Sequence, residues 1–162
     1  MKTVAAAVVA AAVPAAFAST FLGSFRGHDY YITDVRASVF DARVDAIDLR
    51  GTLASLNSAE EETWLRERVG NEKLFIGFSD EALEGEFIWD SGEAVTYTNW
   101  APNEPNDHGN GEDFVLMNWN SRGEWNDMRG NANYRAVIEV VPTPGAAAIA
   151  SMGLLALARR RR

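Results

Sequence analysis

Apolar side chains recur along this chain at two periods, one typical of helices and one typical of strands. Phe40, Val44 and Ile47 follow one another at helical spacing. An amphipathic helix is therefore predicted over residues 38–49, with these three side chains on its apolar face.

A second helix is predicted from a start signal followed by apolar residues. Ser58 and Glu61 have the spacing of a capping box, in which the two side chains satisfy free N–H groups of the first helical turn. Trp64, Leu65 and Val69 come next in the chain, so we expect the helix to begin just after Ser58.

Short apolar runs bounded by turn-forming residues predict the strands. They cover residues 29–33, 74–78, 114–117, 124–125 and 134–141. Residues 79–111 show little periodicity and are rich in Gly, Pro, Asn and Asp, and a long irregular loop in a compact domain usually has a function. Two helices beside a small antiparallel sheet, with one long loop, make an α+β domain.

The N-terminal segment differs in composition from the region that follows it. Residues 1–18 start with a lysine after the initial Met, continue as an apolar run and end in Ala16-Phe17-Ala18. This layout is typical of a secretory signal peptide cleaved after Ala18. The alternative, a buried N-terminal helix, would lack caps and a polar face. We therefore expect an exported protein whose folded domain covers residues 19–141.

The C-terminal segment, residues 142–162, carries a second targeting pattern. Pro142-Thr143-Pro144 precedes an apolar run that ends in Arg159–Arg162. The run is shorter than the roughly 20 residues that span a bilayer, but an apolar run followed by arginines is typical of a membrane-inserted tail. The order resembles the bacterial PEP-CTERM sorting signal, without its usual glutamate between the prolines. That resemblance implies transient membrane insertion and removal by an exosortase-like sorting protease; a retained anchor is the alternative.

The chain is acidic, and the expected processing makes it more so. It carries 15 basic and 23 acidic residues, a net charge of −8. Removal of both ends takes Lys2 and four arginines but no acid, which leaves 10 basic and 23 acidic residues, a net charge of −13. Such a surface is a poor partner for nucleic acid, and it suits an extracellular or cell-surface protein.

Side chains that could bind a ligand are most concentrated in residues 104–113, whose sequence is Glu-Pro-Asn-Asp-His-Gly-Asn-Gly-Glu-Asp. Carboxylate and amide oxygens in that number suit Ca²⁺, which takes about six to eight oxygen ligands. The chain has no Cys and His108 is the only His in the segment, which argues against a zinc or soft-metal site there. A solvated acidic loop without a metal is the alternative.

Identity and spacing together resemble a known family. Glu104-Pro105-Asn106, Glu112 and Trp125-Asn126-Asp127 are similar to the sugar-binding calcium site of C-type lectins of the mannose-type, Glu-Pro-Asn subgroup. The resemblance covers residues 29–141 and implies the C-type lectin-like fold. Further matching segments are Phe75-Ile76-Gly77-Phe78, residues 51–56 with 58–61, and Thr98-Asn99-Trp100.

The resemblance implies one or two calcium ions and assigns ligands to each. The principal site, which would also bind the sugar, comprises Glu104, Asn106, Glu112, Asn126 and Asp127. The auxiliary site comprises Asp80, Glu84, Asp107, Glu112 and Asp113. The resemblance also implies a cis peptide bond before Pro105. It implies ligands with equatorial vicinal hydroxyls, as in mannose, glucose, N-acetylglucosamine or fucose; galactose-binding members carry Gln-Pro-Asp instead.

Members of this family usually contain two disulfides, and this chain has no cysteine. Aligning the motifs places Ala46, Phe114, Gly130 and Ile138 at or near the four cysteine positions. Small or apolar packing would then replace the Ala46–Ile138 and Phe114–Gly130 pairs. Loss of disulfides can cost a small domain about 2–5 kcal/mol, part of which calcium binding could supply.

The sequence therefore predicts an exported domain that binds glycans or exopolysaccharide with the help of calcium. The main alternative is a C-type lectin-like module that binds protein or serves as a surface scaffold, with calcium only structural; ice or mineral binding is more distant. An enzyme is not expected, because no activated nucleophile is evident and His28 and His108 have no catalytic partners. Trp100, Trp119 and Trp125 are expected to pack within the core and loops.

Overall fold

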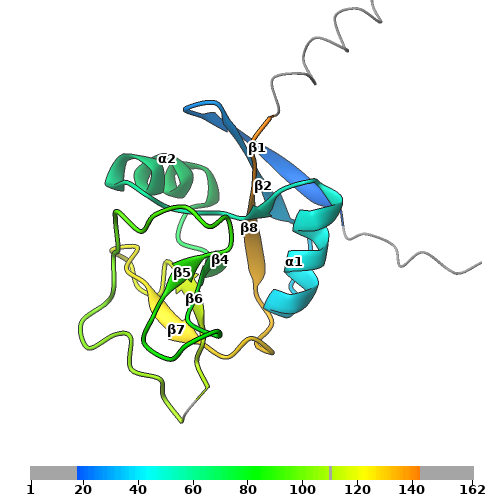
Figure 1. Cartoon of the computed structure of the whole chain (residues 1–162). Helices are drawn as coiled ribbons and strands as arrows, with labels where there is room; N and C mark the ends of the chain where they lie inside the picture. The colour runs from blue at the N-terminus through cyan, green and yellow to red at the C-terminus, as the bar shows by residue number, and fades with distance from the viewer. Residues whose placement is uncertain (1–17, 110, 143–162) are drawn as a thin grey trace, which may run out of the picture.

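The computed structural model describes residues 18–109 and 111–142 (Figure 1). The predicted signal peptide and C-terminal sorting tail fall almost entirely outside these residues, so both stay predictions. Within the described part of the chain, no helix has the length and apolar character needed to cross a bilayer.

The described residues contain two helices and eight strands. In chain order they are β1 (Ser19–Phe25), β2 (His28–Thr33), α1 (Val39–Asp48), β3 (Thr52–Leu53), α2 (Ala59–Val69), β4 (Leu74–Ser79), β5 (Ile88–Trp89), β6 (Phe114–Met117), β7 (Asn126–Met128) and β8 (Arg135–Val140). Both helices and four of the predicted strands are confirmed. The sequence patterns missed β1, β3 and β5, and they placed β7 two residues too early.

Both helices begin at a serine cap, as short-range sequence signals can specify. The Oγ atoms of Ser38 and Ser58 accept hydrogen bonds from the backbone N–H groups of Asp41 and Glu61, each at 3.2 Å. The reciprocal half of the capping box is displaced by one residue, because the Glu61 carboxylate accepts from the N–H of Asn57 at 3.0 Å. These caps satisfy N–H groups that the first helical turn leaves free.

The strands form one mixed sheet in the order β1-β2-β8-β4-β6-β7, with β3 paired to β8 and β5 paired to β4. The α+β fold is confirmed, and one strand pair departs from the predicted antiparallel pairing: β4 and β8 run parallel, with Leu74 opposite Arg135. That pair joins β1, β2, β3 and β8 to β4, β5, β6 and β7, the part of the sheet from which the loop between β5 and β6 extends. In Figure 1 this loop, in green and yellow-green, projects beyond β5, β6 and β7.

Both faces of the central strand β4 are buried, so the domain has two core clusters. Leu74, Ile76 and Phe78 belong to the cluster that includes α2, and Phe75 belongs to the cluster under α1. The alternation follows from the period of two along a strand. Gly77 interrupts it because a Cβ there would lie 2.5 Å from the carbonyl oxygen of Leu53, so only glycine allows β3 to approach β4 this closely.

Helix α1 packs against the sheet with a different face from the predicted one. Phe40, Val44 and Ile47 are 51%, 51% and 70% exposed, whereas Ala42 and Ala46 are buried. The prediction was wrong because the small alanine side chains let the helix lie close to the sheet, and the larger apolar stripe turns outward. Helical spacing identifies an apolar stripe but does not decide which of two such stripes meets the sheet.

Apolar packing fills the positions at which the family resemblance places disulfides. Ala46 and Ile138 are almost fully buried members of the core cluster under α1. Phe114 belongs to the same cluster and lies directly against Gly130. The domain thus replaces both expected cross-links with close contacts between small and apolar residues.

Candidate functional site

The acidic loop, residues 104–113 with Asn110 outside the described residues, is held against β7 by one buried carboxylate. Asp127 is 1% exposed, and its Oδ2 accepts hydrogen bonds from the N–H groups of Asn106 (2.9 Å) and Asp107 (2.6 Å). The Glu104–Pro105 peptide bond just before these donors is cis, as the resemblance implied. A side chain on a sheet strand therefore positions the backbone of the loop.

Strand pairing and a buried tryptophan set the position of β7 itself. Asn126 and Asp127 pair with Leu116 and Val115 of β6 in an antiparallel register. Trp125 is fully buried, and its backbone N–H donates to the carbonyl of Asn99 at 2.7 Å. Trp100 and Trp119, by contrast, are only partly buried. The two residues predicted to bind metal thus lie on a strand that β6 and the buried Trp125 hold in place.

Glu62 of α2 anchors this region, and no sequence motif marked it. Its carboxylate is 3% exposed and accepts from Trp125 Nε1 (2.9 Å), the Tyr97 hydroxyl (2.5 Å) and Asn99 Nδ2 (3.1 Å). One buried carboxylate therefore links α2 to the loop between β5 and β6 and to Trp125, the residue before β7. Its sequence neighbours are also acidic, so only the tertiary contacts distinguish it.

The five residues predicted for the principal site lie on the acidic loop and on β7, and the contacts among them are pairwise. The side-chain amide of Asn106 donates to Glu104, and the amide of Asn126 donates to the carbonyl of Asp127. Glu112 reaches the loop backbone, where its Oε2 accepts from the N–H of His108 at 3.1 Å. Each carboxylate thus has an amide or a second carboxylate beside it.

Burial, together with the neighbouring carboxyl groups, raises the pKa of Glu104 to about 7. Burial is the largest cause, followed by the hydrogen bond and the negative charge of Asp127 and then the charge of Glu112. Asn106 opposes the shift by donating to the carboxylate. Without a cation, the cluster therefore holds a proton near neutral pH.

The predicted auxiliary site is partly assembled on the other side of the acidic loop. Carboxylate oxygens of Asp80, Glu84 and Asp113 lie within 4.8 Å of one another. Burial raises the pKa of Asp80, and slight desolvation together with the charge of Asp80 raises the pKa of the exposed Glu84. Asp107 is turned toward the backbone instead, and its Oδ1 accepts from the N–H groups of Gly111 (2.5 Å) and Glu112 (3.0 Å).

The oxygen ligands of the principal and auxiliary sites fit a hard cation. Oδ1 of Asp127 and Oδ1 of Asp80 are buried and have no hydrogen-bond partner among the described residues. A buried carboxylate oxygen without a partner is costly unless a cation satisfies it. Because the candidate ligands are carboxylate and amide oxygens, the ion that suits them best is Ca²⁺.

Comparisons with known proteins identify the family of this domain. The family described as the lectin C-type domain matches residues 36–138. The low affinity immunoglobulin epsilon Fc receptor of Mus musculus is 39% identical over 103 residues, which are 64% of this chain and 30% of the receptor. The chain thus spans about a third of the length of the curated relatives it matches.

Solved structures give the same result. The cow C-type carbohydrate-recognition domain of CD23, determined in the presence of a GlcNAc2Man3 oligosaccharide, has a TM-score of 0.68 and 35% identity, and the match covers 74% of this chain and 92% of that domain. A herring type II antifreeze protein has a TM-score of 0.71 at 20% identity, covering 81% of this chain and 100% of that one. The second likeness concerns the fold alone.

Proposed function

Because this chain belongs to the C-type lectin domain family, we propose that its acidic loop and β7 form a calcium-dependent site for carbohydrate. Members of this family, among them the CD23 domain, are binding proteins. The observation that carries the proposal is the position of Asp127, whose Oδ2 holds the loop while its buried Oδ1 has no partner among the described residues.

Calcium ligands at the principal site are Glu104, Asn106, Glu112, Asn126 and Asp127. Bound there, Ca²⁺ would leave coordination positions open to two vicinal hydroxyls of a sugar. The protein side chains form hydrogen bonds with those hydroxyls, because a carboxylate accepts a hydrogen bond and an amide NH₂ donates one. Glu104 with Asn106 serves one hydroxyl, and Glu112 with Asn126 serves the other.

This polarity selects the class of sugar. The Glu-Pro-Asn order favours mannose, glucose, N-acetylglucosamine or fucose-like ligands, in which the two hydroxyls are equatorial. The CD23 domain to which this chain is similar was determined with an oligosaccharide that contains mannose and N-acetylglucosamine, which supports the assignment. The natural ligand we propose is a glycan or exopolysaccharide with such sugars at accessible ends.

The auxiliary set, Asp80, Glu84, Asp107, Glu112 and Asp113, supports the sugar site indirectly. The convergence of three of these carboxylates favours a second calcium ion between β4 and the acidic loop. The carbonyl oxygen of Asp113 already accepts from the N–H of Asp80 at 3.1 Å, so these segments are adjacent without a metal. A second ion would add order to the loop that presents the sugar ligands.

Retention on a mannose resin tests the proposal. A single exposed site of this kind has a dissociation constant of about 1 mM, or roughly −4 kcal/mol, so the assay must be multivalent. We expect the full chain to stay on the resin in millimolar Ca²⁺ and to elute with a chelator or free mannose. A galactose resin is the matched control. Passage through the mannose resin in Ca²⁺, with the domain folded, would overturn the proposal.

A protein-binding or scaffold role with structural calcium is the second candidate. The observation that favours it is the exposed apolar stripe of Phe40, Val44 and Ile47 on α1, because contiguous exposed apolar surface often marks an interaction site. A glycan array run with and without chelator distinguishes the two functions. Binding to no glycan under either condition, with a calcium-dependent rise in melting temperature, would favour the second.

The proposed location follows from the two ends of the sequence. We infer export through residues 1–18 and transient insertion of residues 142–162 in a membrane before an exosortase-like protease removes them. The support is compositional: an Ala16-Phe17-Ala18 ending at one end and the proline, apolar and arginine order at the other. Intact mass of the surface protein from its native host tests both cleavages. Retention of Arg159–Arg162 would favour a permanent anchor.

A further inference from the structure

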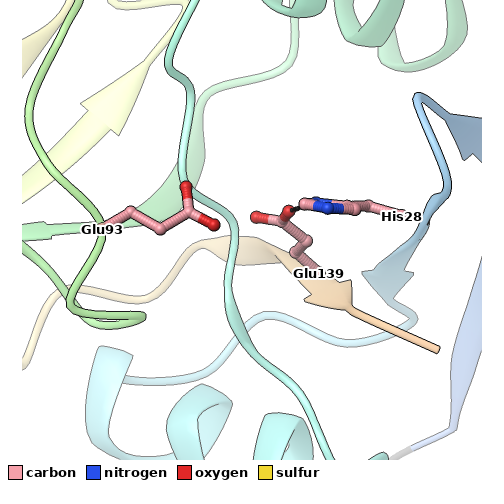
Figure 2. Close-up of side chains that lie close together, drawn as sticks. All are labelled: His28, Glu93 and Glu139. Atoms are coloured by element: carbon pink, nitrogen blue, oxygen red, sulfur yellow. Dashed lines mark hydrogen bonds and ion pairs between the residues drawn. The ribbon is translucent and has the colours of Figure 1, made fainter. Parts of the chain in front are cut away.

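Three side chains that commonly bind metals converge away from the acidic loop. Figure 2 shows His28 from β2, Glu139 from β8 and Glu93 from the loop after β5, with the two carboxyl groups pointing toward one another. One potential ligand atom from each lies within 4.8 Å of the other two. Because the residues come from three separate segments, only the fold brings them together.

Glu139 is the fixed member of this cluster. It is 4% exposed, its Oε2 accepts from the N–H of Ser55 at 2.9 Å, and its Oε1 contacts Nδ1 of His28 and the Tyr30 hydroxyl. His28 has a third of its side chain exposed. Glu93 is exposed, and its side chain accepts a hydrogen bond from Asn57 Nδ2 at 2.6 Å. A rigid buried carboxylate thus faces two ligands that solvent can reach.

The cluster has more negative charge than its neighbours neutralise. The Tyr30 hydroxyl links Glu139 to a third acid, Glu61. Across the described part of the chain, no Lys or Arg forms an ion pair with Glu61, Glu93 or Glu139, and the one basic side chain in contact with them is His28, itself a member of the cluster. Facing carboxylates repel one another unless a proton or a cation lies between them, so the arrangement favours a bound cation.

We propose that His28, Glu93 and Glu139 bind a divalent transition metal of the Zn²⁺ class. A neutral imidazole nitrogen with two carboxylates is a zinc ligand set, and three protein ligands leave a fourth position for water. Mixed nitrogen and oxygen ligands favour Zn²⁺ over Ca²⁺, which prefers six to eight oxygens. Glu93 can close the set with a small movement because it is exposed. This site differs from the site proposed on the acidic loop in its position, its ligands and its class of metal.

Calorimetric titration of Zn²⁺ into the full chain saturated with Ca²⁺ tests the proposal, because excess Ca²⁺ occupies the acidic loop. We expect one zinc per chain. His28→Gln and Glu93→Gln should each weaken zinc binding by at least about tenfold, since each removes one of three ligands. His108→Gln and Glu67→Gln are matched controls and should bind zinc as the unchanged chain does, because His108 lies in the acidic loop and Glu67 is exposed on α2.

Three results would overturn the proposal. Unchanged zinc affinity in both His28→Gln and Glu93→Gln would show that the cluster is not the site. Equal loss in His108→Gln, or displacement of zinc by further Ca²⁺, would place the metal in the acidic loop. If His28→Gln is unstable, Glu93→Gln alone decides the test. Glu93 is exposed, so its substitution leaves the buried contacts of Glu139 in place. Thermal melting in chelator checks that both variants fold.

Discussion

The ring of Phe114 lies so close to Gly130 that no side chain fits between them. A Cβ on Gly130 would lie 2.6 Å from Cε2 of Phe114 and 2.8 Å from Cζ of Phe40. The two rings themselves meet edge to face, with centroids 5.3 Å apart. Aromatic packing against a glycine therefore occupies the place where the family resemblance puts one of the disulfides.

Gly130→Ala should destabilise the domain by about 1–3 kcal/mol, because the added methyl group must displace a ring in a filled core. Phe114 is 3% exposed and has little room to move. Urea unfolding followed by circular dichroism measures the change. Asn131→Ala, at an exposed neighbouring position, should alter stability by less than about 0.5 kcal/mol. An unchanged unfolding midpoint in Gly130→Ala would contradict the close contact.

The orientation of α1 makes a second prediction. Ile47→Ser should change the free energy of unfolding by less than about 0.5 kcal/mol, because Ile47 is exposed. Ala46→Leu, on the next residue back, should cost about 1–3 kcal/mol by forcing the helix away from the sheet. If Ile47→Ser lowered the free energy of unfolding more than Ala46→Leu in a urea titration, the face predicted from helical spacing would be the buried one.

Glu62 should affect both stability and calcium affinity. Glu62→Ala leaves the buried donors of Trp125, Tyr97 and Asn99 without an acceptor, at a cost of about 1–3 kcal/mol. Because Trp125 precedes the Asn126–Asp127 pair, we also expect weaker calcium binding in a calorimetric titration. Glu60→Ala, exposed in the same helical turn, is the control. Calcium affinity equal to that of the control would show that Glu62 supports only the fold.

The raised pKa of Glu104 predicts that calcium binding weakens in mild acid. Its pKa in the folded, metal-free domain is about 7, above the ordinary 4.5. Protonation of Glu104 therefore stabilises the metal-free domain fully below pH 4.5, and this contribution is lost as the pH rises through about 7. Since Ca²⁺ must displace that proton, affinity should fall by up to about tenfold per pH unit below 7.

Calcium titrations between pH 5.5 and 8 in the unchanged chain, Glu104→Gln and His108→Gln assign the proton. Glu104→Gln should bind calcium with a flatter pH dependence, because the amide cannot take up the proton but still offers an oxygen. His108→Gln should keep the original dependence. If the dependence disappears in His108→Gln instead, the competing proton belongs to the histidine.

Reversing acid and amide at the principal site should alter sugar choice. Glu104→Gln combined with Asn106→Asp keeps an oxygen ligand at both positions but reverses the hydrogen-bond polarity offered to the hydroxyls. We expect retention to move from mannose resin to galactose resin. Asn126→Ala should abolish retention on both, because it removes a metal ligand and a hydroxyl donor. Calcium-dependent retention of Asn126→Ala on mannose resin would show that these roles are wrong.

Local signals in the sequence determined the elements and the candidate ligands. Ser38 and Ser58 mark the helix starts because a cap depends only on residues within one helical turn. The apolar run at Leu74 and the alternating closing segments identify buried strands because their patterns are also short-range. The residues from Glu104 to Asp113 carry more than half of the candidate ligands in one continuous stretch, so identity and spacing are enough to propose a site.

Contacts between distant residues decided the rest, and no local period encodes them. The burial of Ala46 in place of Ile47 depends on how closely α1 approaches the sheet. The parallel pairing of β4 with β8, the role of Glu62 and the convergence of His28, Glu93 and Glu139 each join segments separated by dozens of residues. Packing and buried hydrogen bonds select among patterns that are locally equivalent, which is why these features appear only in the folded chain.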